Sequence, residues 1–212
     1  MRKGYFITFE GGEGTGKSTQ LALVKEALEQ RGIKACVTRE PGGTELAEEI
    51  RGVLLSPRNE TVDPTTELLL MFAARAQHLA RVILPAVDRG EWVLCDRFTD
   101  ATYAYQHGGR GVDGDKIATL ERLVQMGVNP DLTLLFDAPI EISLQRMRDR
   151  GALDRFEREG LEFMQRVRSA YLTRARGESE RFRVIDATAT VDDVHASVNL
   201  HLEPLVNAWV SV

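Results

Sequence analysis

The residues from Gly11 to Thr19, GGEGTGKST, carry the most specific chemical signal in the sequence. Gly11, Gly16, Lys17 and Ser18 match G-x-x-x-x-G-K-[S/T], a pattern that follows a strand and opens a helix in nucleoside triphosphate binding proteins. In such a loop the backbone amides surround phosphate oxygens, the lysine reaches the β- and γ-phosphates, and the serine hydroxyl ligates Mg²⁺. An accidental glycine-rich turn is the alternative, and the strand–helix setting disfavours it. The loop therefore predicts a bound nucleoside triphosphate with Mg²⁺.

A second pair of candidate residues follows the apolar run at 92–95. Asp96 ends this expected strand, and Arg97 comes directly after it. Ligands bind at the carboxyl ends of the strands in a parallel sheet, so Asp96 is placed to orient Mg²⁺ or its waters, and Arg97 to reach a phosphate. A helix cap is the alternative for Asp96, and a surface ion pair is the alternative for Arg97.

Arginines recur where the walls of a cleft are expected. They are Arg39, Arg51, Arg75, Arg150 and Arg155. Arg75 interrupts an apolar helical stripe that contains Leu68, Phe72 and Leu79, so it is either buried with a partner or faces a ligand cavity. Transfer of a phosphoryl group between two anions needs several planar cations to align donor and acceptor, whereas a simple ATPase or GTPase switch needs fewer. The sequence also lacks the guanine-reading N-K-x-D motif.

Short apolar runs alternate with longer helical patterns along the chain. Strands are expected over 5–9, 34–38, 92–96, 132–137 and 182–186, and helices over about 17–30, 44–55, 64–87, 113–126, 139–150, 156–176 and 191–206. Thr44 and the pair Asp63-Pro64 are helix start signals. The near-continuous apolar strands and their alternation with helices predict an α/β fold, with one domain over 1–212 and a parallel sheet covered by helices on both faces. The segments 107–114 and 148–160, rich in glycine and charge, are expected to be mobile.

Composition excludes several classes of function. The chain has 212 residues and a formal net charge of -5, which disfavours a general nucleic-acid binder because such proteins need a basic surface. Its apolar runs are too short to span a bilayer, and no apolar stretch of signal-peptide length precedes the glycine loop. Cys36 and Cys95 lie in apolar runs, which predicts buried, reduced thiols. These features favour a cytoplasmic protein without nucleic-acid or membrane partners.

These residues together resemble the thymidylate kinases, which phosphorylate dTMP with ATP, in their bacterial form. The resemblance covers essentially the whole chain and is carried by the stretches FEGGEGTGKST (9–19), TREPGGTELAEEIRGVLL (38–55), ELLLMFAARAQHL (67–79), CDRFTDATYAYQHGGRG (95–111) and RGALDRFE (150–157). Many ATPases share the glycine loop, but DRFTDATYAYQ preceded by REPGGT is much more specific. The resemblance implies a P-loop nucleoside monophosphate kinase fold with five parallel strands, a lid at about 148–160, Mg²⁺ as cofactor, ATP and dTMP as substrates, and a homodimer.

The resemblance also implies a role for each matching residue. The ATP phosphates would lie on Gly11, Gly12, Glu13, Gly14, Thr15, Gly16, Lys17, Ser18 and Thr19, with Asp96 and Ser18 at the metal. Glu13 would approach the sugar 3′-hydroxyl of dTMP, and Arg39, Arg51 and Arg97 would surround its phosphate. Arg75, Thr102 and Gln106 would read the thymine, and Tyr105 would exclude ribose. The spacing of Thr102, Tyr105 and Gln106 places them on one helix face, which an ordinary amphipathic turn explains equally well.

Members of the family differ in where their catalytic arginine resides. The glycine loop offers Glu13 and Thr15 but no arginine, as in the bacterial arrangement, in which the lid supplies it. Arg150 is therefore the candidate, with Arg155 beside it. Arg146 lies one helical turn earlier, at the position where an arginine of the family stacks on adenine. A solvated, charged segment is the alternative for all three arginines.

The chain departs from the family pattern at one position. A phenylalanine four residues before the thymine-binding arginine usually stacks on the base, whereas Met71 occupies that position and Phe72 follows it. Either side chain could cover the ring. Two other functions also stay open: a kinase of another nucleotide or deoxynucleoside, which would lack the set Arg75, Thr102 and Gln106, and a non-catalytic P-loop module, which would need neither acceptor-site arginines nor a lid.

Overall fold

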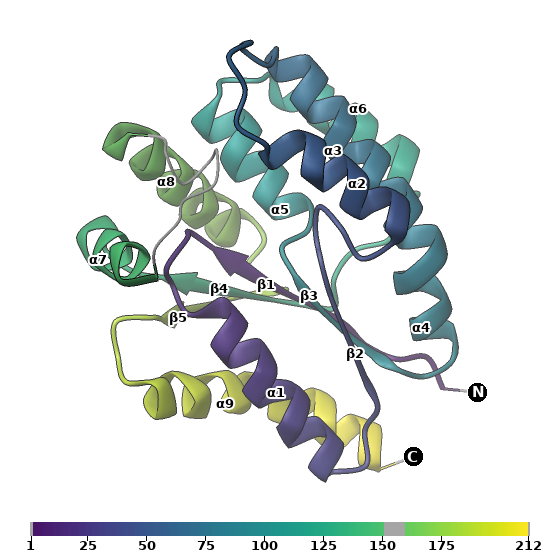
Figure 1. The fold of residues 1–212 in the computed structure, drawn as a ribbon. Helices are drawn as coiled ribbons and strands as arrows, with labels where there is room; N and C mark the ends of the chain where they lie inside the picture. Colours follow the sequence, from purple (N-terminus) through teal and green to yellow (C-terminus); the bar gives the residue numbers. More distant parts are fainter. Residues whose placement is uncertain (1, 151–159, 212) are drawn as a thin grey trace.

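A five-stranded, fully parallel sheet lies at the centre of the computed structural model, which describes residues 2–150 and 160–211 (Figure 1). The strands are β1 (Phe6–Gly11), β2 (Ala35–Arg39), β3 (Trp92–Asp96), β4 (Leu132–Asp137) and β5 (Phe182–Asp186), in the order β2-β3-β1-β4-β5. The predicted strands and fold class are thus confirmed. The register pairs Phe9 with Asp96, so the glycine loop after β1 begins at the same sheet edge at which β3 ends.

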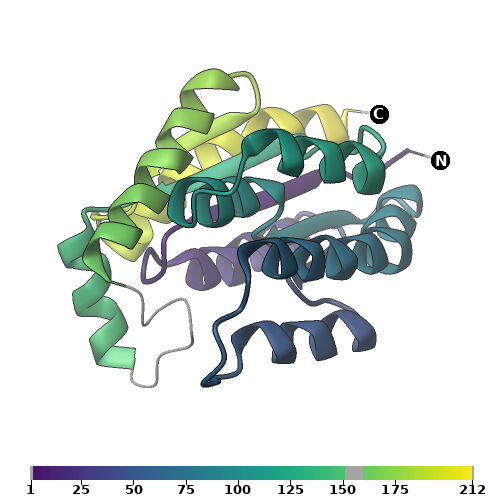
Figure 2. The same cartoon turned by 90° about the horizontal axis from the view of Figure 1, so that it is seen from above.

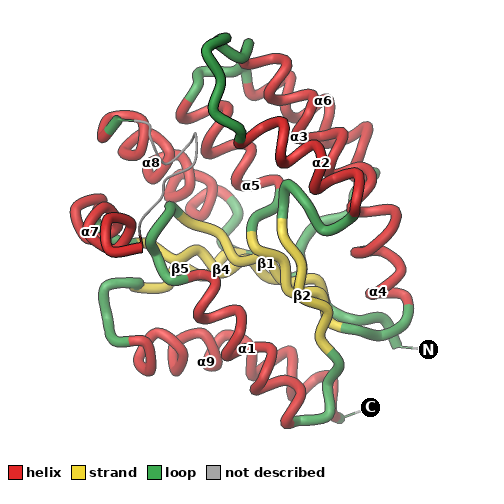
Figure 3. The backbone as a smooth tube through the Cα atoms, in the orientation of Figure 1, coloured by secondary structure: helices red, strands yellow, loops and turns green. Residues whose placement is uncertain are grey.

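Helices cover both faces of the sheet, as the apolar strands predict (Figures 1 and 3), and Figure 2 shows the same arrangement from above. Helices α1 (Lys17–Gln30) and α9 (Val191–Val210) lie on one face, where Val24 of α1 and Val198 of α9 pack against Phe9. On the other face, Ile83 and Phe98 pack against Val93 of β3. Burial of these side chains from water is the main driving force for the layered arrangement.

The segment from Pro64 to Asp88, expected as one helix, consists of α3 (Pro64–His78), a π-helical turn η1 (Leu79–Ile83) and α4 (Leu84–Asp88). Asp63 caps its start by accepting hydrogen bonds from the amides of Thr65 (2.8 Å) and Thr66 (3.2 Å). Pro85 has no amide hydrogen and its ring crowds the preceding turn, which explains the wider turn just before it.

By length and composition alone, the segment Pro64–Asp88 also qualifies as a candidate membrane span. It contains Glu67, Arg75 and His78, each buried and each bonded to a polar group elsewhere in the fold. Buried polar groups paired in this way are typical of a core helix.

The segment after β3 is more regular than its glycine content indicates. It forms α5 (Thr99–Thr102) and a π-helix, η2 (Tyr103–Gly109), and α6 (Gly114–Gln125) begins shortly after it. The guanidinium of Arg166 donates a hydrogen bond to the carbonyl of Gly109 (3.1 Å), so η2 is held against α8 (Leu161–Gly177). Residues 107–109 of the segment 107–114, which was expected to be mobile, are thus helical and packed, because tertiary contacts override the local effect of the glycines.

The remaining helix boundaries follow the sequence signals closely. Helix α2 (Glu45–Leu55) is capped by Thr44, whose hydroxyl accepts a hydrogen bond from the amide of Ala47 (3.1 Å). Helix α9 continues four residues beyond the expected end at Val206, and α7 spans Ile140–Arg150. Residues 156–159 of the helix expected over 156–176 lie outside the described residues. Cys36 and Cys95 are free thiols on the adjacent strands β2 and β3. Cys95 is fully buried, as predicted, whereas Cys36 is only half-buried, because β2 is at the edge of the sheet.

Candidate active site

The glycine loop adopts the backbone that the motif requires. Gly11 (φ 133°) and Gly14 (φ 71°) lie in the left-handed region, which favours glycine. A Cβ at Gly11 would also approach the carbonyl oxygen of Phe136 to 2.3 Å, and one at Gly14 would approach that of Ser143 to 2.5 Å. Helix α1 begins directly afterwards at Lys17, so the loop amides and the helix N-terminus face the same space. This is a geometry suited to phosphate groups.

Lys17 is held inside the loop. Its ammonium donates hydrogen bonds to the carbonyls of Gly12 (2.7 Å) and Gly11 (3.2 Å), and the residue is 6% exposed. Burial lowers the pKa of Lys17, and the charge of Arg97 adds to the effect, whereas nearby carboxylates oppose it. A desolvated cation in this position interacts strongly with an anion that enters the loop.

A cavity of about 600 Å³ opens over the loop. Its walls are residues 13–19 of the loop and, from other elements, Arg39, Glu40, Arg51, Asp96, Arg97 and Arg146. We call it the P-loop cavity. It brings together nearly all the residues predicted to contact ATP, except Gly11 and Gly12, whose carbonyls instead hold Lys17.

Asp96 and Ser18 meet the requirements of a magnesium site in this cavity. The Oδ1 atom of Asp96 is buried and has no hydrogen-bond partner in the described part of the chain. It does not cap the following helix α5, which begins after Phe98. One carboxylate, one hydroxyl and phosphate oxygens form the kind of oxygen ligand set that Mg²⁺ prefers, with few protein ligands. The residues therefore fit Mg²⁺, although they do not form a dedicated protein cage.

Three arginines on the cavity wall are already in contact with other groups. Arg39 pairs with Glu48 through two hydrogen bonds of 2.9 and 3.2 Å. Arg51 donates to the carbonyl of Pro41 (2.9 Å), and Arg146 donates to that of Ala187 (2.8 Å). These contacts orient the guanidinium groups on the cavity wall, where they can bind anionic ligands.

Arg97 directly follows β3, and its side chain contacts the glycine loop. Its backbone is in the left-handed region (φ 69°), which is uncommon for a residue other than glycine. Its guanidinium donates to the carbonyl of Gly11 (2.8 Å) and pairs with the carboxylate of Glu13. Burial by itself would lower the pKa of Arg97, but the acidic groups around it, Glu13 foremost, together outweigh this effect, raise the pKa and keep the guanidinium charged.

A second pocket adjoins the P-loop cavity between α3 and α5, and we call it the inner pocket. The predicted residues on its walls are Glu13, Arg51, Met71, Arg75, Arg97, Thr102, Tyr105 and Gln106. Glu13, Arg51 and Arg97 also line the P-loop cavity, so the two spaces meet at the Glu13–Arg97 pair. Two ligands bound in them would have their facing ends at this junction.

Arg75 is both buried with a partner and directed to a cavity, so the two alternatives are not exclusive. It is 2% exposed, and it donates from Nε to Glu40 (2.7 Å) and from Nη2 to the hydroxyl of Thr102 (2.9 Å). Glu40 also contacts the ring of His78 (3.0 Å). Nη1 of Arg75 is buried without a hydrogen-bond partner among the described residues. Since such an atom is costly to leave unpaired, it marks a place for an acceptor from a ligand.

Met71 and Phe72 lie in different surroundings in the structure. Met71 lines the inner pocket, whereas Phe72 belongs to a buried cluster with Leu68 and lies outside the residues that line the pocket. The centroid of its ring lies 4.7 Å from the guanidinium carbon of Arg75, so the ring makes a cation–π contact with the arginine. Of the two stacking candidates, only Met71 is in position to cover a base in this pocket.

Several pocket residues were missed in the sequence. They are Glu40, Pro41, Leu55, Phe98 and Ala101. Glu40 was detectable in principle, because a buried arginine requires an anionic partner and REPGGT follows an expected strand. The apolar residues carry no local signal that distinguishes a pocket wall from a core position.

Glu10 lies beneath the site as a fully buried carboxylate of β1. Burial, together with the charge of Asp100, raises its pKa from an ordinary value of 4.5 to about 7, although Arg97 and hydrogen bonds from Tyr171 and the Phe98 amide oppose the rise. The folded protein therefore binds a proton at Glu10 more tightly than the unfolded chain does. As pH rises from about 4.5 to 7, this difference lowers the free energy of unfolding.

We expect Glu10→Gln to become progressively more stable relative to the wild type as pH rises from 5 to 8. The change should be on the order of 3 kcal/mol, because one pKa unit corresponds to about 1.4 kcal/mol. Urea unfolding at several pH values measures it, with each protein compared with the other at the same pH. Parallel stability curves for the two proteins would contradict a raised pKa at Glu10.

The candidate lid arginines cannot be placed in the same way. Helix α7 ends at Arg150, but the side chain of Arg150 and the whole of Arg155 lie outside the described residues, as does most of the segment 148–160. Their roles stay predictions.

Comparisons with known proteins agree with this geometry. A sequence model described as thymidylate kinase matches residues 9–198. A thymidylate kinase of Pseudomonas syringae pv. syringae is 57% identical over 203 residues, which cover 96% of this chain and 97% of the relative. One of Chromohalobacter salexigens is 57% identical over 211 residues, 99% of this chain and 100% of the relative. The crystal structure of thymidylate kinase from Ehrlichia chaffeensis superimposes with a TM-score of 0.77 at 34% identity, covering 94% of this chain and 99% of that one. The family model spans most of the chain and the relatives cover nearly all of it, so the chain belongs to the thymidylate kinase family.

Proposed function

We propose that the protein transfers the γ-phosphoryl group of ATP to dTMP and so forms dTDP and ADP. The observation that carries this proposal is the unpaired Nη1 of Arg75 in the inner pocket, next to the cavity of the P-loop. A thymine O4 would accept the hydrogen bond that Nη1 has to offer. The placement of the P-loop cavity beside this pocket supports a donor and an acceptor bound end to end.

Gln106 supports the choice of base. Its amide nitrogen donates to the buried carboxylate of Glu67 (2.9 Å), which can only accept when ionised, so its amide oxygen is the atom left for the pocket. This oxygen can accept from N3–H of thymine. Cytosine has an acceptor at N3 and an amino group at C4, so it would oppose Gln106 with an acceptor and Arg75 with a donor. A mismatch of this kind is a strong source of discrimination.

The sugar and phosphate of dTMP would then lie toward the junction of the two cavities. Arg97 and Arg51 line both cavities and would bind the acceptor phosphate, with Arg39 at the P-loop side. Glu13 would face the sugar 3′-hydroxyl, and Tyr105 would occupy the space beside its 2′ carbon. Because the attacking phosphate oxygen is already anionic at neutral pH, no strong general base is needed.

Catalysis then depends on alignment and on charge neutralisation. Lys17 would contact the β- and γ-phosphates. Ser18 and Asp96 would hold Mg²⁺, which would supply further positive charge to the phosphates. Arg146 would lie against the adenine. The segment 148–160 would close as a lid and bring Arg150 to the transferring group, a role that rests on sequence alone.

Three further features belong to this proposal. We infer that the chain is a single kinase domain over 1–212 and a cytoplasmic enzyme without nucleic-acid or membrane partners. It would act as a homodimer. Exposed apolar side chains on α3 and on the two helices packed against it, α2 and α6, support dimerisation, namely Leu69, Val53 and Leu123.

Turnover with each common nucleoside monophosphate as acceptor tests the function. ADP production from ATP should depend on dTMP and be much slower with dCMP, AMP, GMP or UMP. A preference for another acceptor would indicate a different nucleotide kinase. A rate of ADP production that does not depend on any acceptor would indicate an ATPase or a regulatory P-loop module.

We expect Arg75→Ala to raise the KM for dTMP at least about tenfold, equivalent to roughly 1.4 kcal/mol, while the KM for ATP stays close to that of the wild type. The loss of the donor at Nη1 leaves the thymine carbonyl unpaired. Steady-state kinetics measures both constants, and Arg75→Lys serves as a companion because it keeps a cation beside Glu40 but lacks the planar fork. Equal losses for both substrates would mean that Arg75 acts on the fold alone.

A further inference from the structure

The guanidinium of Arg97 has a contact that the proposed reaction does not explain. Besides Gly11 and Glu13, its Nη1 donates a hydrogen bond to the hydroxyl of Tyr171 (3.1 Å). Tyr171 lies on α8, 1% exposed, far from the P-loop in sequence. The arginine is therefore held from the side of α8 as well as from the loop.

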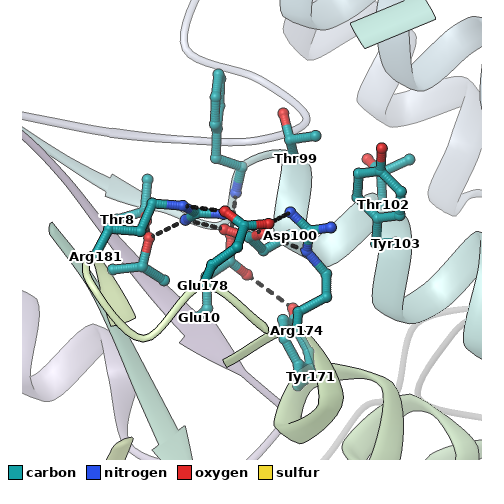
Figure 4. A network of polar contacts seen from close by, with 12 residues as sticks. Thr8, Glu10, Thr99, Asp100, Thr102, Tyr103, Tyr171, Arg174, Glu178 and Arg181 are labelled. Atoms are coloured by element: carbon teal, nitrogen blue, oxygen red, sulfur yellow. Dashed lines mark hydrogen bonds and ion pairs between the residues drawn. The ribbon is translucent and has the colours of Figure 1, made fainter. Parts of the chain in front are cut away.

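Tyr171 in turn is bonded to Glu10. The Tyr171 hydroxyl donates to Oε2 of Glu10 (2.8 Å), as Figure 4 shows, while Oε1 accepts from the amide of Phe98 (2.6 Å). Burial and the charge of Glu10 raise the pKa of Tyr171 well above its ordinary value, so the hydroxyl keeps its proton and can donate it. Glu10 thus acts on Arg97 twice: through the hydroxyl of Tyr171 and through the backbone that directly follows Arg97.

The position of Tyr171 is itself fixed by ion pairs from its own helix and from the turn that follows it. Arg174, three residues after Tyr171, donates from Nε to Asp100 of α5 (2.6 Å). Arg181 donates to both oxygens of Asp100 at 2.7 and 2.8 Å, beside Glu10 in Figure 4. Burial would raise the pKa of Asp100, but Arg181 and Arg174 outweigh it and keep the pKa low, so the pairs stay charged. Helix α8 is thereby locked to α5, with the tyrosine hydroxyl directed at Arg97.

We propose that Glu10 and Tyr171 are positioning residues for Arg97, and that this relay orients the guanidinium toward the acceptor phosphate. The inference rests on the proposed function, in which Arg97 binds the phosphate of dTMP. Arg97 has an uncommon backbone conformation and a long side chain with several rotamers. Without the relay, only its contacts with Gly11 and Glu13, both in the P-loop, would hold its guanidinium. A fixed orientation lowers the entropy lost when the phosphate binds.

The unfavourable burial of Glu10 supports this role. A carboxylate in the centre of a sheet is a poor source of stability at neutral pH, and a glutamine of the same shape would remove its cost. The carboxylate of Glu10 accepts the hydrogen bonds of Tyr171 and Phe98 together, one at each oxygen. Glutamine could accept only one of them, because its amide nitrogen cannot accept a hydrogen bond. Glu10 is therefore suited to orienting Arg97 rather than to stabilising the fold.

Removal of one oxygen atom tests the relay. Tyr171→Phe should weaken dTMP binding at least about fivefold and leave the KM for ATP within about twofold, because a hydrogen bond to a charged group is lost. Tyr103→Phe is the matched control: its hydroxyl also donates to a glutamate, Glu121 (2.7 Å), but it does not contact Arg97. Equilibrium dTMP binding and steady-state kinetics of the two full-length variants give the comparison.

The decisive measurement repeats Tyr171→Phe in an Arg97→Ala background. If the tyrosine acts through Arg97, its removal should change the dTMP dissociation constant of that background by less than about twofold. An equal loss in both backgrounds, or unchanged dTMP binding in folded Tyr171→Phe, would overturn the proposal. Should Tyr171→Phe fail to fold, Glu10→Gln takes its place with the same expected pattern. Wild-type protein that does not bind dTMP would instead contradict the proposed function.

Discussion

Replacement of Lys17 by methionine is expected to lower kcat about 10²- to 10³-fold, the range seen when one pre-organised donor to a developing charge is removed. Lys17 is buried in the P-loop with its ammonium on the carbonyls of Gly11 and Gly12, close to the position that ATP phosphates would occupy. Methionine keeps the unbranched apolar stem and removes the cation, so packing in α1 should survive. The KM for ATP should also rise, because Lys17 contacts the ground state as well as the transition state.

Lys25→Met provides the matched control for Lys17→Met. Lys25 lies on the same helix, where its exposed ammonium pairs with Glu29 (3.6 Å), and such surface pairs contribute little. Steady-state kinetics with circular dichroism separates loss of catalysis from loss of fold. A Lys17→Met enzyme with nearly normal kcat and ATP binding would show that the loop does not hold the triphosphate as proposed.

Removal of the lid arginine should be comparably severe. We expect Arg150→Ala to lower kcat at least about a hundredfold. This is less than the 10³–10⁵ that arginines contribute in phosphoryl transfer, because Arg155 is available as a partial substitute. In the described part of the P-loop cavity, Arg39, Arg97 and Arg146 are held by Glu48, Glu13 and the Ala187 carbonyl. An additional cation from the end of α7 would act mainly on the transition state. The KM values should therefore change much less than kcat.

Three variants make the test of Arg150 specific. Arg150→Lys should recover only part of the loss, because an ammonium cannot make a planar two-pronged contact. Arg148→Ala removes an exposed arginine from the same helix and should leave kcat unchanged. Loss of kcat in Arg155→Ala but not in Arg150→Ala would move the role to Arg155. Normal turnover of both single variants and of the double variant would exclude the lid as the source of the cation.

Much of the site could be predicted from the local sequence, because short motifs specify its chemistry. The P-loop needs glycines at set spacings, and a parallel sheet places the residue after each strand at one edge, so Lys17, Ser18, Asp96 and Arg97 were found together. The family resemblance added Arg75, Thr102, Tyr105 and Gln106, which share the inner pocket. Phe72 was not separable from Met71, since positions three and four residues before Arg75 lie on the same helix face.

The sequence by itself determined the five strands, the helix start signals at Thr44 and Asp63, the P-loop and the reaction class, because periodicity, capping and phosphate binding depend on residues near one another in the chain. Only the tertiary structure decided the pairing of Glu40 with Arg75 and the relay from Glu10 through Tyr171 to Arg97. It also decided the helical form of residues 103–109. These contacts join residues up to 161 positions apart, as from Glu10 to Tyr171. Their energies arise from burial and the exclusion of water, which no local pattern of residues records.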